Sequence, residues 1–144
     1  KTHPWIVCEI GGKIAGYAYA SAHRSRCSYN WSSEVTVYVD SEFRRKKVGS
    51  KLYEALFKLL RHQGFYNAFA GITLPNLASE GLHKSLGFSR VGIYKNGGYK
   101  LDKWHDVVWY QLELQKGGVP KNPKPFEELL NLKVYKGLLN SDSM

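Results

Sequence analysis

Four consecutive cations stand directly between an expected strand and an expected helix. The strand ends at Val39, and the apolar spacing of a helix begins at Val48. The first N–H groups of a helix are unpaired and carry partial positive charge, so a helix that starts here suits a pyrophosphate. Gly49 has no Cβ, which allows a ligand to approach the backbone closely. The alternative is a solvated basic turn; the four cations are Arg44, Arg45, Lys46 and Lys47.

The elements around this turn follow from hydrophobic periodicity. Apolar residues at 48, 52, 55, 56, 59 and 60 predict an amphipathic helix over 48–62, ended by Gly64. Apolar and β-branched runs predict strands over 5–10, 14–20, 34–39, 66–73, 91–94 and 104–114, with turns at 11–12 and 96–98. A second helix is expected over 77–86, and a loop over 21–32. This order predicts an α/β (α+β) fold, a mixed twisted sheet with flanking helices.

Composition narrows the class of protein. The chain has 144 residues, of which 43% are hydrophobic, so we expect one domain with a core rather than a disordered chain. The net charge of +9 suits an anionic partner, whether a phosphorylated cofactor, a nucleic acid or a membrane surface. No apolar run approaches the ~18 residues that span a bilayer. Cys8 and Cys27 form neither a disulfide framework nor a metal-ligand spacing, so we expect no metal and a reducing, cytoplasmic setting.

The basic turn resembles the acetyl-CoA loop of the GNAT N-acetyltransferases, Gln/Arg-x-x-Gly-x-Gly/Ala. Arg44 and Gly49 match this pattern, whereas Lys47 stands where the family usually has Gly. Further segments resemble the phosphinothricin N-acetyltransferase family in order and spacing, among them Val37-Tyr38-Val39, Leu74-Pro75-Asn76, His83-Lys84-Ser85-Leu86-Gly87-Phe88 and Trp104-His105-Asp106-Val107.

The resemblance also implies a domain organisation. It covers residues 4–114, so we expect residues 1–114 to form a GNAT domain. Family members begin with a strand and two helices before the segment like Pro4-Trp5, so this domain is expected to be N-terminally incomplete. Residues 115–125 are rich in Gly and Pro and are expected to be a linker. A tail with a short helix and a strand over 126–139 is expected to follow within 115–144.

The resemblance assigns roles to individual residues. Glu34 matches the proposed catalytic glutamate, and its carboxylate suits a general base, although a strand-end Glu in solvent is the alternative. His83 stands where many GNAT proteins carry a Tyr, which is considered the acid for the leaving thiolate. Its imidazole suits the same catalytic role or a share in the base role, although a structural helical His is the alternative. The pantetheine is expected to pair with the freed strand edge like an added strand. The implied acetyl-CoA contacts are Val37, Tyr38, Val39, Val48, Gly49, Ser50, Asn76 and the four cations of the turn.

The acceptor is expected to be the primary amine of a small amino acid or amino-acid-like toxin. Arg24, Arg26 and Tyr29 precede Glu34, and Arg binds carboxylate or phosphinate groups with two parallel hydrogen bonds. Lys100, Trp104 and Asp106 are family-like, although the bulk of Trp104 also suits a core. The alternatives are another amine, such as a polyamine or peptide N-terminus, a non-catalytic CoA binder, or a basic nucleic-acid-binding module. The resemblance further implies a homodimer with no nucleic-acid or membrane partner.

Overall fold

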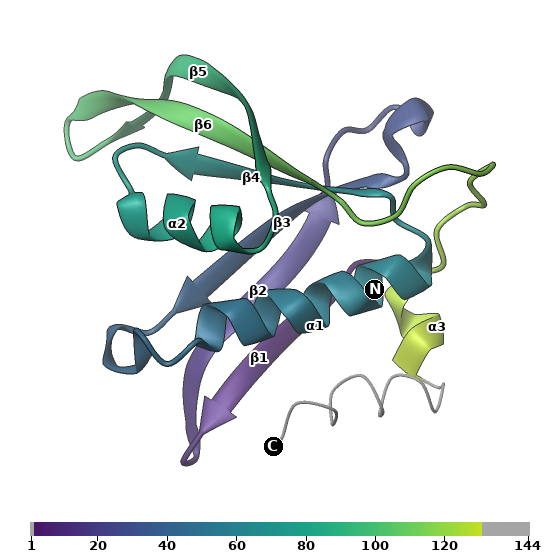
Figure 1. Cartoon of the computed structure of the whole chain (residues 1–144), viewed down its shortest axis with the longest axis horizontal. Helices are drawn as coiled ribbons and strands as arrows, with labels where there is room; N and C mark the ends of the chain where they lie inside the picture. Colours follow the sequence, from purple (N-terminus) through teal and green to yellow (C-terminus); the bar gives the residue numbers. More distant parts are fainter. Residues whose placement is uncertain (1, 131–144) are drawn as a thin grey trace.

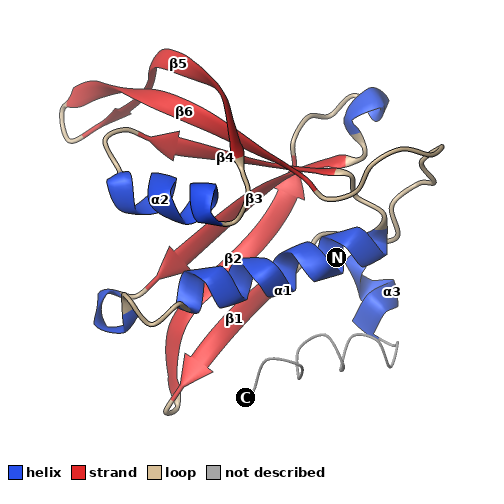
Figure 2. Ribbon diagram, in the orientation of Figure 1, coloured by secondary structure: helices blue, strands red, loops and turns tan. Residues whose placement is uncertain are grey.

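The computed structural model describes residues 2–130, which form one mixed sheet with helices on it (Figures 1 and 2). Within these residues the sheet has six strands in the order β1-β2-β3-β4-β6-β5. The strands are β1 (Trp5–Ile10), β2 (Lys13–Ala22), β3 (Ser32–Val39), β4 (Asn67–Thr73), β5 (Ser89–Lys100) and β6 (Lys103–Glu113). The helices are α1 (Val48–Gln63), α2 (Leu77–Ser85) and α3 (Phe126–Leu130).

The sheet is mixed because one connection between neighbouring strands is a helix. β3 and β4 are parallel and joined through α1, whereas the other neighbouring pairs are antiparallel. A parallel pair needs such a crossover, and α1 supplies it. The predicted α+β fold with a mixed sheet is thereby confirmed. None of the helices in the described part of the chain is long and apolar enough to cross a membrane.

Helix α1 is the main cover of one sheet face. Its buried side chains recur at the spacing expected for one helix face, including Leu52, Leu56 and Leu60. They pack on small buried residues of β2, such as Ala15 and Ala18, which let the helix approach the sheet closely. The helix ends at Gly64, whose φ of 99° suits the left-handed cap that glycine adopts without strain.

The opposite face of β1, β2 and β3 carries a row of aromatic side chains. Trp5 stacks on Tyr19 at 4.4 Å between ring centroids, and Tyr17 stacks on Tyr38 at 5.3 Å. Trp5 is 57% exposed and Tyr38 is 51% exposed. Tyr38 therefore points away from α1, as its place between Val37 and Val39 predicts.

The predicted turn at 96–98 is wrong. β5 continues through these residues to Lys100, and its pairing with β6 shifts register between Tyr94 and Gly98. The segment is thus a bulge, which a Gly pair tolerates. The chain reverses instead at Leu101 and Asp102, whose φ values of 52° and 61° are typical of a two-residue hairpin turn. The predicted loop over 21–32 is also too long, because β2 includes Ala22 and β3 begins at Ser32.

The segment after β6 contacts the core. The Lys124 N–H donates to the Gln63 carbonyl, and the Phe126 N–H donates to the Thr2 carbonyl. Phe126 and Leu129 of α3 are buried. A helix that begins at Phe126 was predicted, and the strand predicted further along the tail lies outside the described residues.

Candidate active site

The site is built around a split in the sheet. β3 and β4 pair at three positions, Ser32 to Glu34 with Asn67 to Phe69, and then diverge. Within residues 2–130, the edge of β3 that faces β4 therefore has no strand partner from Val35 onward, although its other edge pairs with β2 up to Val39. The cleft in the split has a volume of about 200 Å³ and is lined by Val35, Thr36, Val37, Tyr53, Ala70, Gly71, Ile72, Thr73, Asn76, Ser79, His83 and Lys100.

The basic turn lies directly before α1 and follows a short 3-10 helix, Ser41–Phe43. Arg45 and Lys47 have left-handed backbone, with φ of 63° and 60°. Lys47 precedes the first turn of α1, and its side chain makes no hydrogen bond to that turn. The unpaired N–H groups of the first turn of α1 therefore remain open to an anion. The left-handed conformation explains in physical terms why glycine suits the Lys47 position.

Gly49 has a second role that its motif does not reveal. A Cβ at this position would lie 3.1 Å from Leu82 Cδ2 and 3.5 Å from Val39 Cγ2. The missing side chain therefore lets the start of α1 pack closely against α2 and β3. Val48 and Gly49 are buried and Ser50 is half-buried, so the start of this helix is fixed in the core.

Replacing Lys47 with Gly should stabilise the fold. A left-handed conformation costs a non-glycine residue about 1 kcal/mol, and a cation at a helix N-terminus is unfavourable. We expect the free energy of unfolding to rise by roughly 0.5–1 kcal/mol, measured by urea denaturation. Lys46 has no positive φ, so Lys46→Gly should give no gain. A loss of stability in Lys47→Gly would contradict this account of the turn.

His83 is buried between the two helices. Its Nε2 lies 2.9 Å from the Tyr53 hydroxyl, and its Nδ1 lies 2.7 Å from the Ser79 carbonyl oxygen. Because the carbonyl can only accept, Nδ1 carries the proton, and the Tyr53 hydroxyl donates to Nε2. Burial lowers the pKa of His83, and the bond to Ser79 partly opposes this effect. Burial raises the pKa of Tyr53 well above its usual value. Both groups are therefore neutral near pH 7.

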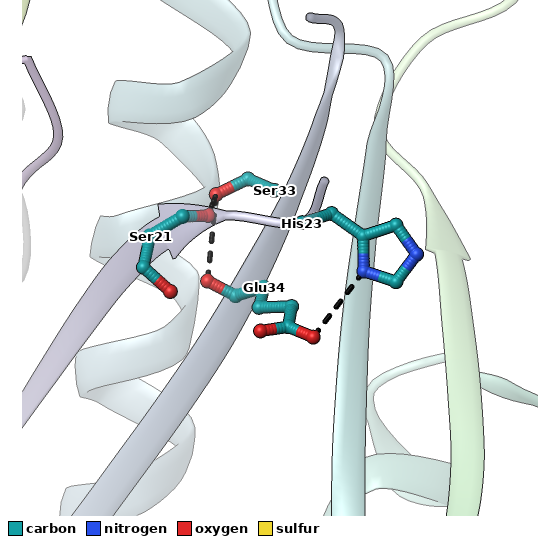
Figure 3. A network of polar contacts seen from close by, with 4 residues as sticks. All are labelled: Ser21, His23, Ser33 and Glu34. Carbon is teal, nitrogen blue, oxygen red and sulfur yellow. Dashed lines mark hydrogen bonds and ion pairs between the residues drawn. The ribbon is translucent and has the colours of Figure 1, made fainter. Parts of the chain in front are cut away.

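Glu34 lies where β3 and β4 part. It is the last β3 residue paired with β4, opposite Phe69, and its side chain is 35% exposed. Its Oε1 is 3.3 Å from Nδ1 of His23, and Figure 3 shows the two side chains pointing toward one another. The carboxylate is thus half-buried and accessible, rather than free in solvent as a strand-end Glu would be.

The three residues predicted to bind the acceptor lie together on the loop between β2 and β3. Arg24, Arg26 and Tyr29 line one cleft with Ser25, and the Arg24 guanidinium is 5.6 Å from the centre of the Tyr29 ring. None of them lines the cleft in the split sheet. His23, the residue before Arg24, connects this loop to Glu34.

Asn76 and the hairpin after β5 border the split cleft. The Asn76 side chain accepts from the Ser79 N–H and caps α2, so it serves the turn as well as lining the cleft. Asp106 accepts from the Asn96 N–H in the bulge of β5, which is a structural contact. Trp104 is 63% exposed, so its bulk does not fill the core.

Comparisons with known proteins agree with this geometry. A sequence model of the Acetyltransferase (GNAT) family matches residues 1–88. A phosphinothricin N-acetyltransferase of Streptomyces viridochromogenes is 39% identical over 127 residues, 88% of this chain and 69% of that protein. The chain belongs to the GNAT acetyltransferase family.

Other relatives of this GNAT chain act on amino-acid analogues or carry acetyl-CoA. An L-methionine sulfoximine/L-methionine sulfone acetyltransferase of Salmonella typhimurium is 34% identical, with 82% of this chain and 69% of that protein covered. A phosphinothricin acetyltransferase of Sinorhizobium meliloti, solved in complex with acetyl-CoA, has a TM-score of 0.77 at 34% identity, with 83% and 66% covered. This chain spans 55% to 69% of the length of the curated relatives that it matches. The predicted family and its use of acetyl-CoA are confirmed.

Three residues of this GNAT site were missed as functional candidates from the sequence. His23 contacts Glu34, Tyr53 contacts His83, and His105 joins the Leu74 and Lys100 carbonyls at 2.9 and 3.1 Å. His105 thereby ties the hairpin after β5 to the loop before α2. Only the strand register would have revealed the first contact, since Ser21 pairs with Glu34 and places His23 nearby.

Proposed function

We propose that this chain transfers an acetyl group from acetyl-CoA to the primary amine of a small amino acid or amino-acid-like toxin with an anionic side group. The observation that carries this proposal is the unpaired edge of β3 beside a basic helix start, with a carboxylate where the strands part. The relative named for phosphinothricin supports an acceptor with an anionic side group, and the relative named for methionine sulfone supports an amino-acid acceptor more generally.

The chain's own residues would hold acetyl-CoA in two places. The N–H groups at the start of α1 and the cations of residues 44–47 would bind the pyrophosphate. The free edge of Val37, Tyr38 and Val39 would pair with the pantetheine as a strand pairs with a sheet edge. Backbone N–H groups there would also stabilise negative charge that develops on the carbonyl oxygen. Bound in this way, acetyl-CoA supplies an activated acetyl group, and Asn76, which lines the same cleft, would contact it.

The two proton transfers of the reaction are assigned to groups on opposite sides of the split between β3 and β4. Glu34 takes a proton from the acceptor amine as the C–N bond forms, directly or through one water. The hydroxyl–imidazole pair of Tyr53 and His83 lines the cleft from the helix side and provides a proton to the sulfur as the C–S bond breaks. The proton given to the sulfur comes from the Tyr53 hydroxyl, since His83 Nδ1 is bound to the Ser79 carbonyl. Glu34 then releases its proton to water and Tyr53 takes one from water, so the protons balance over one turnover.

The anionic group of the acceptor would bind the loop before Glu34. Arg24 and Arg26 line a cleft with Tyr29, and guanidinium groups bind carboxylates and phosphinates with two parallel hydrogen bonds. His23 precedes Arg24 and contacts Glu34, so this loop would hold the acceptor on the side of that carboxylate. A polyamine would instead be repelled by this loop.

We further propose that the chain forms a homodimer and that it works in a reducing cytoplasm. Sedimentation velocity checks the homodimer.

An acceptor screen tests the function. Thiol release from acetyl-CoA is measured with phosphinothricin, methionine sulfone and glutamate analogues, and with spermidine and a peptide N-terminus for comparison. We expect turnover with the amino acids, fastest with those whose side group is anionic, and none with spermidine or the peptide, together with a rise in Tm on adding acetyl-CoA. Preference for spermidine or the peptide would overturn the acceptor class. Stabilisation by acetyl-CoA without thiol release would indicate a non-catalytic binder.

A further inference from the structure

His23 is a histidine held in a fixed place beside the proposed base. It follows the last residue of β2, and its side chain is 16% exposed. Its ring stacks on Phe69 at 4.4 Å between centroids with an interplanar angle of 14°, and the edge of Trp109 packs at 6.0 Å. Two aromatic side chains from β4 and β6 therefore define where this imidazole lies.

The hydrogen bond between His23 and Glu34 has a defined direction. The carboxylate can only accept, so the imidazole donates from Nδ1 to Oε1 over 3.3 Å. This is the one hydrogen bond of the Glu34 carboxylate among residues 2–130. The other carboxylate oxygen stays available, and the side chain retains partial exposure.

The backbone around this pair is clamped as well. Ser33 is buried, and its hydroxyl donates to the Ser21 carbonyl oxygen over 2.8 Å. This bond crosses from β3 to β2 one residue from Glu34 and two from His23 (Figure 3). This bond supports the strand register that brings the imidazole to the carboxylate.

We propose that His23 is a positioning residue for Glu34. The imidazole holds Oε1, so that Oε2 faces the acceptor amine in one orientation and takes its proton. This inference rests on the proposed function, because it assigns His23 to the same proton transfer. His23 touches no reacting atom; it acts through the carboxylate.

Two substitutions distinguish the role of the His23 hydrogen-bond donor from the role of its aromatic ring. His23→Phe keeps a ring on Phe69 and removes the donor, whereas His23→Asn keeps a donor near the Nδ1 position and removes the ring. A positioned base contributes about 10²- to 10⁴-fold, so losing its orientation should lower kcat by about tenfold in His23→Phe. We expect KM for acetyl-CoA and the Tm to stay unchanged, and His23→Asn to recover most of kcat. The same two changes at His62, exposed on α1, serve as controls and should change neither parameter.

A double variant and a spectroscopic measurement decide the outcome. In a Glu34→Gln background, His23→Phe should lower kcat no further, because its effect passes through the carboxylate. An equal fall in both backgrounds overturns the proposal, as does full kcat in His23→Phe. Long-range proton–nitrogen NMR should place the neutral ring's proton on Nδ1, and Glu34→Ala should abolish this preference. A proton on Nε2 in the unmodified protein overturns the inference, whether or not any acceptor is turned over. A failure to turn over any acceptor would by itself contradict only the proposed function.

Discussion

Replacing Glu34 with Gln is expected to lower kcat by about 10²- to 10⁴-fold, the usual contribution of a positioned general base. The amide keeps the size of the side chain and can still accept from His23, but it cannot take the proton of an amine. The proposed pyrophosphate site is elsewhere, before α1, so the Kd for acetyl-CoA should stay unchanged. Thiol release with saturating acceptor gives kcat, and calorimetry gives the Kd.

The matched control for this variant is Glu113→Gln. Glu113 ends β6 on the surface, where its carboxylate lies 4.0 Å from Lys116 Nζ. An exposed pair of this kind contributes little to stability, so we expect normal turnover. Full turnover in Glu34→Gln would show that another group, or bulk water, removes the proton.

Reversing two charges of the basic turn should weaken acetyl-CoA binding strongly. The double variant Arg45→Glu, Lys47→Glu replaces two cations before α1 with anions. A hydrogen bond to a charged group is worth about 1.5–3 kcal/mol, and about 1.4 kcal/mol corresponds to tenfold in affinity. We expect KM for acetyl-CoA to rise at least about tenfold, with the Tm maintained because acidic residues favour a helix N-terminus.

The control is a charge reversal at the other end of α1. Lys121 lies near Gly64, the cap of this 16-residue helix, which is about 24 Å long. That separation exceeds the screening length of about 8–10 Å at moderate salt, so Lys121→Glu should leave KM unchanged. Equal effects of the two changes would mean that the net charge attracts acetyl-CoA and that the turn does not bind it.

Local sequence patterns predicted the elements whose signals are local. The helix over 48–62 was found within one residue, because its apolar spacing and Gly64 both lie in the chain itself. β1 matched its predicted bounds, since two glycines mark the hairpin that follows. The turn at 96–98 failed because Asn-Gly-Gly suits a bulge as well as a hairpin, and the pairing with β6 decides between them.

The candidate site likewise has one part that the local sequence predicts and one part that it does not. The basic turn and the helix after it are contiguous in the chain, so the position of the turn before a helix was predictable from residues 39–60 alone. The contacts of His23 with Glu34 and of Tyr53 with His83 join residues 11 and 30 positions apart. Such contacts depend on strand register and helix packing. Neither His23 nor Tyr53 carries a local sequence signal that distinguishes it from an ordinary His or Tyr.

The split between β3 and β4 leaves the sheet as two halves joined by three residue pairs. One half is β1-β2-β3 under α1, and the other is β4-β6-β5 with α2. Each half keeps its own hydrogen-bonded strands, so either can open transiently without breaking the other's ladder. A molecule bound along the gap would couple the two opening equilibria into one, so that ligand occupancy would set the cooperativity of the whole domain.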